Sequence, residues 1–293
     1  MDYSAFLESN LLTPDYLVHA QKWFNPLGDA IAMHQKGAQR PFYVGINGAQ
    51  GSGKSTLSQY LVEYLSQEKQ LSVVALSLDD FYLSKSDRLA MSVKIHPLLK
   101  TRGVPGTHDV SLLQKTLKQL GEYGTVSLPK FDKSTDDPYS VLEWPVVNAP
   151  VDVVIFEGWC WGAEPQPSTA LAYAVNSLEK EHDGLGVWRE YVNSALRQQY
   201  VPLQNMMNYW VMLKAPDFDC VSTWRLEQEN KLRQKVSPEK ATTLMDETQV
   251  KAFVSYFERL TRHILDTLPE RANCVFELDN KRHITGVVAE YMK

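Results

Sequence analysis

The chain of 293 residues has few cysteines, and their spacing excludes two classes of structure. Cys160, Cys220 and Cys274 are far apart and odd in number, so neither a disulfide framework nor a CxxC metal site can be drawn. Free thiols are typical of proteins in a reducing compartment. We therefore expect a cytoplasmic protein.

The chain also lacks an excess of positive charge and a long hydrophobic run. Acidic residues outnumber basic ones by 35 to 30, so no general positive field attracts nucleic acid or anionic lipid. The longest apolar runs, such as Val153–Phe156, are far shorter than the about 18–20 residues that cross a bilayer. The N-terminus has Asp2 and Glu8 but no basic residue before an apolar run, which is unlike a signal peptide. We expect neither nucleic acid nor a membrane as a partner.

Internal repeats and low-complexity linkers are also absent, so nothing divides the chain into separate domains. The composition is that of a globular protein, with 44% hydrophobic and 22% charged residues. We predict one domain over residues 1–293, with an N-terminal helical extension over 1–40. The sequence carries no indication of the oligomeric state.

Short apolar runs alternate with segments that carry apolar residues on one helical face. The runs predict strands at 41–47, 71–78, 151–156, 209–213 and 274–278. The one-sided segments predict helices at 14–36, 57–65, 109–120, 218–235 and 248–268. Residues 125–144 and 158–186 are rich in Pro, Gly, Asp and Ser and predict loops. Continuously apolar strands between helices predict a three-layer α/β/α fold with a mainly parallel central sheet.

Residues 48–55, with the sequence GAQGSGKS, match the phosphate-loop pattern G-x-x-x-x-G-K-[ST]. A predicted strand precedes them and a predicted helix follows, which is the context that the pattern requires. Backbone N–H groups of such a loop surround phosphates, the lysine neutralises the β- and γ-phosphates, and the Ser/Thr hydroxyl binds Mg²⁺. The cofactors are therefore predicted to be ATP and Mg²⁺. The predicted nucleotide-binding residues are Gly48, Ala49, Gln50, Gly51, Ser52, Gly53, Lys54, Ser55 and Thr56.

Carboxylates follow two further predicted strands. Asp79 and Asp80 come after the strand at 71–78, and Glu157 comes after the strand at 151–156. Side chains at the carboxyl ends of parallel strands face one crevice. We predict that Asp79 accepts the proton of an attacking hydroxyl and that Glu157 helps to hold Mg²⁺. The alternatives are that Asp79 only caps a helix or turn, and that Glu157 is a buried acid bonded to a backbone turn. Asp80 is placed at the substrate. Metal binding, a supporting role behind the groups that bind directly, and a turn cap are the alternatives for it.

Other phosphate-loop proteins have signatures that this chain lacks or distorts. The nearest match to the guanine-reading N-K-x-D is Asn280 to His283, which ends in histidine. The D-x-x-G at Asp183 to Gly186 lies in a loop-like stretch instead of after a strand, and no transporter signature is present. These features disfavour motor and switch proteins.

Six segments, in order, carry a family resemblance. They are GAQGSGKS at 48–55, SLDDFYL at 77–83, RGVPGTHD at 102–109, LPKFDKS at 128–134, FEGW at 156–159 and WRLEQE at 224–229. With these segments the chain resembles the plant-type D-glycerate 3-kinases and their fungal ATP-dependent kinase relatives. These kinases belong to the group that includes uridine kinases, pantothenate kinases and phosphoribulokinases. The resemblance covers about residues 40–260 and implies a phosphate-loop kinase fold in which the catalytic base falls on Asp79.

A small hydroxy acid would need cations for its carboxylate. Arg102, Lys130 and Lys133 lie in loops that a ligand could reach, and Arg102 offers a bidentate fork. Tyr82 and His108 are further candidates for substrate contact. Each of these residues also has an alternative without a substrate contact. Tyr82 would only pack in the core, His108 would be a residue of the first helical turn, and the two lysines would be solvated loop residues.

The helices predicted within 217–268 form a candidate lid over the phosphates. Arg225 and Arg233 are eight residues apart and share a helix face, and Lys231 lies between them. An arginine of this kind often stabilises charge on a transferring phosphoryl group, and we assign this role to Arg225. Surface ion pairs of both arginines with Glu229 are the alternative.

The sequence therefore predicts a kinase that transfers the γ-phosphate of ATP to a hydroxyl of a small acid, with D-glycerate to 3-phosphoglycerate as the specific reaction. Another small-metabolite acceptor, such as a nucleoside, pantothenate or a sugar, is one alternative. A nucleotide-dependent regulatory protein without an acceptor is the other. Asp79 favours a kinase, because a regulatory switch does not need a base for an acceptor hydroxyl.

Overall fold

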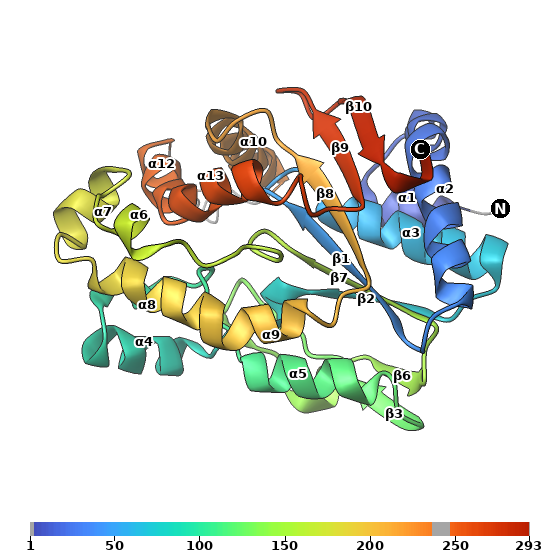
Figure 1. Ribbon diagram of the computed structural model, residues 1–293, viewed down its shortest axis with the longest axis horizontal. Helices are drawn as coiled ribbons and strands as arrows, with labels where there is room; N and C mark the ends of the chain where they lie inside the picture. The colour runs from blue at the N-terminus through green and yellow to red at the C-terminus, as the bar shows by residue number, and fades with distance from the viewer. Residues whose placement is uncertain (1–2, 236–246, 293) are drawn as a thin grey trace.

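A six-stranded sheet forms the centre of the molecule (Figure 1). The computed structural model describes the backbone of residues 3–235 and 247–292, and the side chains of the same residues except 228–235. The strand order is β10-β9-β8-β1-β7-β2, and neighbouring strands are parallel except for β10, which is antiparallel to β9. This confirms the mainly parallel sheet. The strands are β1 (Phe42–Gly48), β2 (Val73–Ser77), β7 (Val153–Gly158), β8 (Tyr209–Lys214), β9 (Cys274–Leu278) and β10 (Ile284–Ala289).

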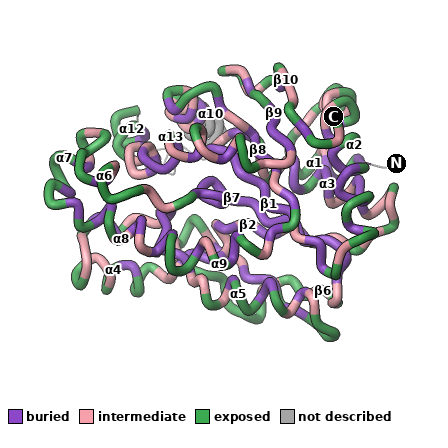
Figure 2. The backbone as a smooth tube through the Cα atoms, in the orientation of Figure 1, coloured by how far each residue is buried: buried purple, intermediate pink, exposed green. Residues whose placement is uncertain are grey.

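Helices cover both faces of the sheet, as the continuously apolar strands predict. In Figure 1, α1, α2 and α3 lie together on one side, and α5, α8 and α9 lie on the other. The bounds are α1 (Ser4–Asn10), α2 (Asp15–Lys36), α3 (Lys54–Lys69), α5 (Val110–Gln119), α8 (Val187–Ala195) and α9 (Val201–Gln204). Figure 2 shows buried strands between helices whose outer sides are exposed.

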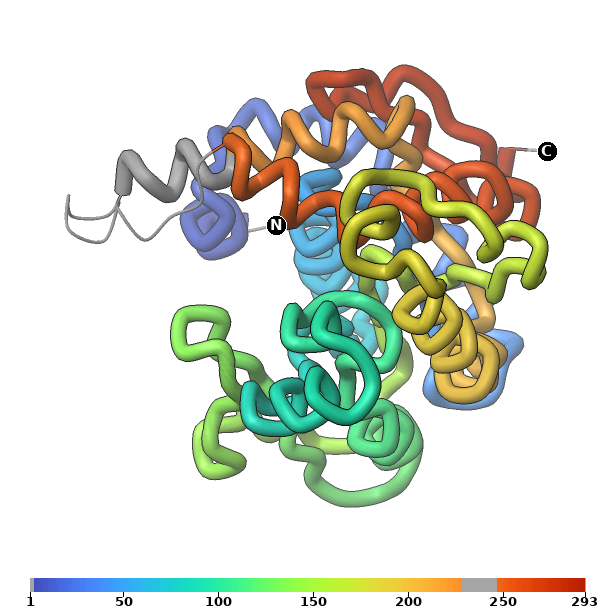
Figure 3. The backbone as a smooth tube through the Cα atoms, turned by 90° about the vertical axis from the view of Figure 1, so that its left-hand side faces the viewer, coloured from blue at the N-terminus to red at the C-terminus, as the bar shows by residue number. Residues whose placement is uncertain are grey.

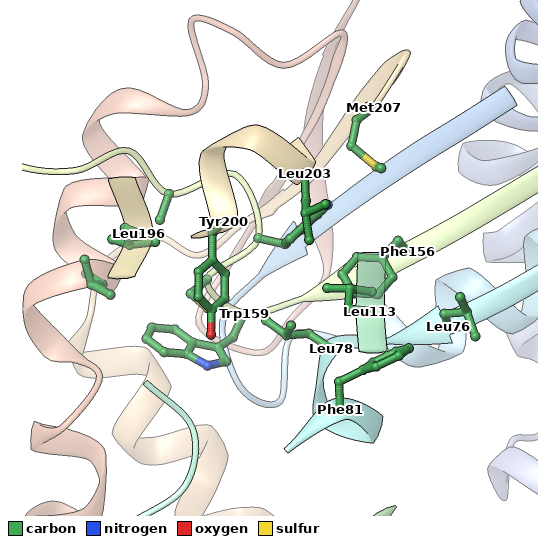
Figure 4. Packing of buried hydrophobic residues seen from close by; sticks show 14 of the residues in the cluster. Leu76, Leu78, Phe81, Leu113, Phe156, Trp159, Leu196, Tyr200, Leu203 and Met207 are labelled. Carbon is green, nitrogen blue, oxygen red and sulfur yellow. The ribbon is translucent and has the colours of Figure 1, made fainter. Parts of the chain in front are cut away.

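Strand β7 divides the core between the two layers, because successive side chains point to opposite faces. Val153 and Ile155 pack in the cluster beneath α2 and α3, whereas Val154 and Phe156 pack in the cluster beneath α5 and α8. Figure 4 shows Phe156 and Leu113 of α5 close together in the second cluster. The fold is therefore the three-layer α/β/α arrangement.

Several predicted elements differ from the observed ones. The helix predicted at 248–268 is two helices, α12 (Glu247–Ser255) and α13 (Glu258–Thr267), because the chain turns at Phe257 to pack that ring against Trp159, with ring centroids 4.9 Å apart. The strand at 274–278 is not the last, since β10 follows it. Helix α4 (Lys85–Lys94) and the helices within 187–204 were not predicted.

The two segments predicted as loops contain short elements. Residues 125–144 take part in two small antiparallel pairs, and residues 158–186 contain two short helices. The strands are β3 (Gly124–Ser127) with β6 (Val146–Ala149) and β4 (Phe131–Asp132) with β5 (Asp137–Pro138), and the helices are α6 (Ser168–Leu171) and α7 (Ser177–His182). Within the described ranges, no helix is both long and apolar enough to cross a membrane.

Helices α10 (Asp219–Lys235) and α12 pack against the phosphate loop. Ala49 of the loop shares a small apolar cluster with Phe218 and Val221 at the start of α10 and with Val250 and Val254 of α12. The helices predicted as a lid therefore lie beside the phosphate loop, and their role as a lid stays a prediction. The side chains of Lys231 and Arg233 lie outside the described residues.

Candidate active site

The phosphate loop connects β1 to α3, and its glycines allow the tight turn. Gly51 and Gly53 have φ values of 78° and 97°, in the left-handed region that glycine adopts at low cost. A Cβ on Gly48 would lie 2.6 Å from Ser52 Oγ, so the loop has no room for a side chain there. The Lys54 ammonium donates to the carbonyl of Ala49 at 3.1 Å. The buried Ser52 hydroxyl has no hydrogen-bond partner among the described residues, which suits a loop that binds an anion.

Ser55 and Glu157 lie together because β7 is the neighbour of β1 in the sheet. The Ser55 hydroxyl donates to Glu157 Oε1 at 2.8 Å, and the Glu157 side chain is buried. These hard oxygen atoms are of the kind that Mg²⁺ prefers. The described residues include no cluster of three or more His, Cys, Asp or Glu side chains suited to a metal. Mg²⁺ does not require one, since it is usually bound by one or two carboxylates, waters and substrate phosphates.

Asp79 lies two residues after the end of β2, the other neighbour of β7, in a single 3-10 turn at Leu78–Phe81. Its Oδ1 accepts a hydrogen bond from the Tyr82 hydroxyl at 2.7 Å, and its Oδ2 accepts one from the Lys133 ammonium at 2.5 Å. Burial acts to raise the pKa of Asp79, but Lys133, Tyr82 and the charge of Lys54 outweigh it and lower the pKa to about 2. The carboxylate is therefore ionised at neutral pH.

The other predicted cations are also paired with acids. The Lys130 ammonium donates to Asp80 Oδ2 at 2.7 Å. The Arg102 guanidinium forms an ion pair with Asp136, and it lies 6.0 Å from the ring centroid of Tyr82. These ion pairs hold the side chains of Lys130 and Arg102 in fixed orientations.

A cavity of about 230 Å³ joins the phosphate loop to these groups. In Figure 3, the segment from α4 to β6, which carries Arg102 and Lys133, lies below, and helices α10 and α12 lie above. The cavity is lined from both sides. The lining residues are Gln50, Gly51, Lys54, Ser55, Asp79, Tyr82, Arg102, Lys133, Glu157, Trp159, Arg225, Phe253 and Phe257.

Beyond the phosphate loop, the structure brings most of the predicted site residues to this cavity, but three of them lie outside its lining. Asp80 and Lys130 form their ion pair beside it. His108 lies behind Tyr82, with ring centroids 4.7 Å apart, and its Nδ1 is 2.6 Å from the Tyr200 hydroxyl. Burial lowers the pKa of His108 to about 3, so the ring is neutral. His108 is thus placed to orient Tyr82, which in turn donates to Asp79.

Three aromatic side chains in the lining were not predicted as site residues. Trp159 follows Glu157 and Gly158 at the end of β7, and its indole N–H donates to the carbonyl of Gly103 at 2.9 Å. Phe253 lies 5.6 Å from the Arg225 guanidinium. Trp159 could have been predicted as a site residue, because it follows a strand that carries a carboxylate at its end. The spacing of Phe253 and Phe257 indicates only a helix face.

Comparisons with known proteins agree with this geometry. Residues 43–163 match the sequence profile of the phosphoribulokinase/uridine kinase family. An uncharacterised kinase of Schizosaccharomyces pombe, mug58, is 34% identical over 84% of this chain and 85% of its own length. The chain belongs to the phosphoribulokinase/uridine kinase family. As a member of this kinase family it is a nucleotide-dependent phosphotransferase.

Two similar proteins are named for a specific activity. The chloroplastic D-glycerate 3-kinase of Arabidopsis thaliana is 29% identical over 82% of this chain and 52% of its own length, so the match spans about half of that relative. The structure of D-glycerate 3-kinase from Cryptococcus neoformans superposes with a TM-score of 0.74 and 29% identity, and the match covers 89% of this chain and 96% of that one.

Proposed function

We propose that this kinase transfers the γ-phosphate of ATP to a hydroxyl group of a small acid, with D-glycerate as acceptor and 3-phosphoglycerate as product. One observation carries the proposal. An ionised carboxylate, Asp79, lines a small cavity that begins at the phosphate loop and has the cations Arg102 and Lys133 on its loop side. The two relatives named D-glycerate 3-kinase support the choice of acceptor.

The size of the cavity favours a short acceptor. Its volume of about 230 Å³ is below the roughly 300–1,000 Å³ of pockets that hold drug-sized ligands. The terminal phosphate of the nucleotide would occupy part of the same space. A three-carbon acid suits the remainder better than a nucleoside or pantothenate does.

The chemistry follows from where the polar groups lie. The acceptor oxygen attacks the γ-phosphorus, its bond to phosphorus forms as the bond to the ADP oxygen breaks, and Asp79 takes the hydroxyl proton. Lys54 and Arg225 would stabilise the charge on the phosphoryl oxygens. A Mg²⁺ ion held by Ser55 and Glu157 would neutralise charge on the phosphates when bound.

Lys133 has to change partners during this reaction. In the structure its ammonium is bonded to Asp79 Oδ2, the carboxylate that must accept the proton. A carboxylate on the acceptor offers Lys133 a replacement anion of the same kind. The acceptor hydroxyl can then take the place of the ammonium at Asp79, so a neutral alcohol would be a poorer substrate than an acid.

The test is an acceptor screen with product identification. Purified protein is supplied with Mg²⁺ and ATP, and ADP release is followed with hydroxy acids, nucleosides, pantothenate and sugars. We expect D-glycerate to stimulate ADP release most and ³¹P NMR to identify 3-phosphoglycerate. Lys54→Ala should lower turnover by orders of magnitude, because the loop loses the positive charge that neutralises the γ-phosphate. Circular dichroism should show that the fold is retained.

Two other results would overturn the proposal in different ways. Preferential phosphorylation of a nucleoside or sugar would leave a kinase with a different acceptor. ADP release that no acceptor stimulates would support the regulatory alternative. Wild-type turnover in a folded Lys54→Ala protein would overturn the assignment of the phosphate loop itself.

A further inference from the structure

Helix α4 buries an arginine where a surface helix usually buries apolar side chains. Of its residues, all of which the structure describes, Arg88 alone is buried, and only 1% of its side chain is exposed. A buried guanidinium costs free energy unless it is paired and hydrogen-bonded, and an apolar side chain of similar volume often serves stability equally well. Stability alone is therefore a weak reason for an arginine at this position.

The contacts of Arg88 converge on one residue of the turn between β4 and β5. Its Nε donates to the carbonyl of Leu83 at 3.2 Å, and its Nη2 donates to the carbonyl of Asp136 at 3.0 Å. The same Nη2 forms an ion pair with Asp136 Oδ2 at 2.8 Å. Arg88 therefore holds both the backbone and the carboxylate of Asp136.

Asp136 presents a fixed anion. Its φ is 63°, in the left-handed region that aspartate adopts more readily than most residues, and its N–H donates to the carbonyl of Asp132 at 2.9 Å. Burial acts to raise the pKa of Asp136, but the hydrogen bonds and charges of Arg88 and Arg102 outweigh it and lower the pKa. The carboxylate is therefore ionised at neutral pH.

The other oxygen of this carboxylate, Oδ1, pairs with Nη1 of Arg102. The Arg102 guanidinium also lies 6.0 Å from the ring centroid of Tyr82 and 5.6 Å from that of Phe131. Among the described residues, Asp136 is its one hydrogen-bond partner, and a guanidinium has five N–H donors. The Nε and Nη2 edge of Arg102 is thus available to a carboxylate in the acceptor cavity, which Arg102 lines.

We propose that Asp136 and Arg88 are positioning residues for the acceptor carboxylate: Arg88 holds Asp136, and Asp136 holds Arg102 with its available edge toward the cavity. Neither residue lines the cavity itself. The inference rests on the proposed use of an acid as acceptor. A long side chain loses rotamer freedom when it binds a ligand, and one that is already held in place loses less. Asp136 thus favours acids although its own charge is negative, because the charge of Arg88 balances it.

The experiment compares D-glycerate with glycerol, which lacks the carboxylate. Asp136→Asn keeps the size of the side chain but removes the charge that holds Arg102. We expect kcat/KM for D-glycerate to fall about tenfold through KM, while kcat, the ATP KM and kcat/KM for glycerol change less than about twofold. Arg88→Lys keeps the buried charge but loses the fork, so it should act in the same direction.

A double-mutant cycle tests whether Asp136 acts through Arg102. In an Arg102→Ala background, Asp136→Asn should change kcat/KM for D-glycerate less than about twofold, because no guanidinium is left to position. Asp137→Asn is the matched control, since it removes the same charge one residue away. Asp137 Oδ1 accepts a hydrogen bond from the Lys85 N–H at 2.8 Å instead of pairing with Arg102. This variant should behave as the wild type does.

Several results would overturn the inference. A lower KM for D-glycerate in Asp136→Asn would show that Asp136 competes with the acceptor for Arg102. Unchanged kinetics, an equal loss with glycerol, an equal loss in Asp137→Asn, or a loss that persists without Arg102 would each exclude positioning through Arg102. Circular dichroism checks the fold of each variant, and Arg88→Lys carries the same comparison if Asp136→Asn does not fold.

Failure of the proposed acceptor has a separate signature. A wild type that uses glycerol as well as D-glycerate would overturn the proposed acid acceptor, and this inference with it, before any variant is measured. A wild type that prefers D-glycerate, with Asp136 and Arg88 variants that keep the same preference, would overturn the inference alone.

Discussion

Asp79 is the residue on which the proposed chemistry depends, and its hydrogen bonds to Tyr82 and Lys133 explain how it is oriented. Asp79→Asn replaces the carboxylate with an amide of similar size that cannot take a proton. We expect kcat to fall about 100-fold or more, with the ATP KM largely retained. Steady-state kinetics with saturating acceptor measures both. An unchanged kcat with weakened ATP binding would instead make Asp79 a metal-binding or structural residue.

The ion pair between Lys133 and Asp79 predicts a change in pH dependence. In the wild type the pKa of Asp79 is lowered to about 2, so the base stays ionised as the pH falls through the mildly acidic range. Lys133→Met removes an interaction that lowers this pKa, while the burial that raises it remains. The acid limb of kcat/KM for the acceptor, which reports the free enzyme in which this ion pair is formed, should therefore move to higher pH. Lys115→Met, at an exposed position on α5, should leave the profile unchanged.

Arg102 offers a test of the preference for acids. Arg102→Lys keeps the charge but loses the bidentate fork, so it should raise the KM for D-glycerate and leave the ATP KM nearly unchanged. Arg102→Ala should raise the KM for D-glycerate further. Rates with glycerol provide the comparison, because glycerol lacks the carboxylate. An Arg102→Ala enzyme that prefers glycerate over glycerol by the wild-type ratio would remove Arg102 from the substrate site.

At the scale of single residues, local motifs allowed much of the candidate site to be predicted. The phosphate loop and Asp79 follow buried strands and Glu157 lies near the end of one, and parallel strands bring such positions to one edge. The ion pairs were not predictable in the same way. Lys133 and Asp79 are separated by 54 positions, and the fold of the intervening chain decides which acid each cation meets.

At the scale of elements, the clearest difference between the predicted helices and the observed ones is at Phe257, where tertiary packing interrupts a helix that the sequence pattern predicts. Residues 248–268 have a helical pattern and no glycine or proline before the end, yet the chain turns between α12 and α13. The turn places Phe257 against Trp159, and a Cβ on Gly103 would lie 2.6 Å from the Phe257 ring. The contact joins three segments that are far apart in the sequence. Helical periodicity contains no information about such a contact.

Helix α13 is also joined to α7 by a buried ion pair, which predicts a large effect on stability. The Arg259 guanidinium bonds to both oxygens of Glu179, and both side chains are buried. Arg259→Met would leave the Glu179 carboxylate buried without its cation, so we expect the free energy of unfolding to fall by about 3–5 kcal/mol. Urea denaturation measures the change.

A matched surface variant tests whether burial is the cause. Lys251 pairs with Glu247 one helical turn away on α12, and both side chains are mostly exposed. Lys251→Met should change the free energy of unfolding by less than about 0.5 kcal/mol. Equal effects of the two substitutions would show that the buried pair has no special role in holding α7 against α13.

At the scale of the whole molecule, ligand binding should stabilise the fold through the phosphate loop. A ligand that binds only the native state raises the free energy of unfolding by about 2.7 kcal/mol at 100 times its Kd. Thermal unfolding with and without Mg²⁺ and ATP should show this increase for the wild type, and Lys54→Ala should show little of it at the same concentrations. Equal stabilisation of both proteins would place the nucleotide elsewhere.

The overall layers were predictable from the sequence, but one of the two edge strands, β10, was not. Five short apolar runs indicated the strands, and the continuous runs among them, at 151–156 and 209–213, indicated a parallel sheet, because both faces of such strands are covered. Strand β10 has no such run: Ile284 and Ala289 are buried, whereas Thr285 is exposed and Gly286 has no side chain to pack. β10 pairs only with β9 at this edge of the sheet, and Thr285 and Gly286 interrupt its apolar pattern.

The position of β1 in the sheet has a consequence for synthesis on the ribosome. Phe42 of β1 pairs with Val153 of β7, and Val44 pairs with Tyr209 of β8. The strand that leads into the phosphate loop is thus made early, but neither of its neighbours exists until much later in translation. Pairing between such distant segments is slow, and unpaired strand edges are prone to aggregate. The nascent N-terminal part should therefore be unable to bind nucleotide and should need protection by chaperones until β7 and β8 have left the exit tunnel.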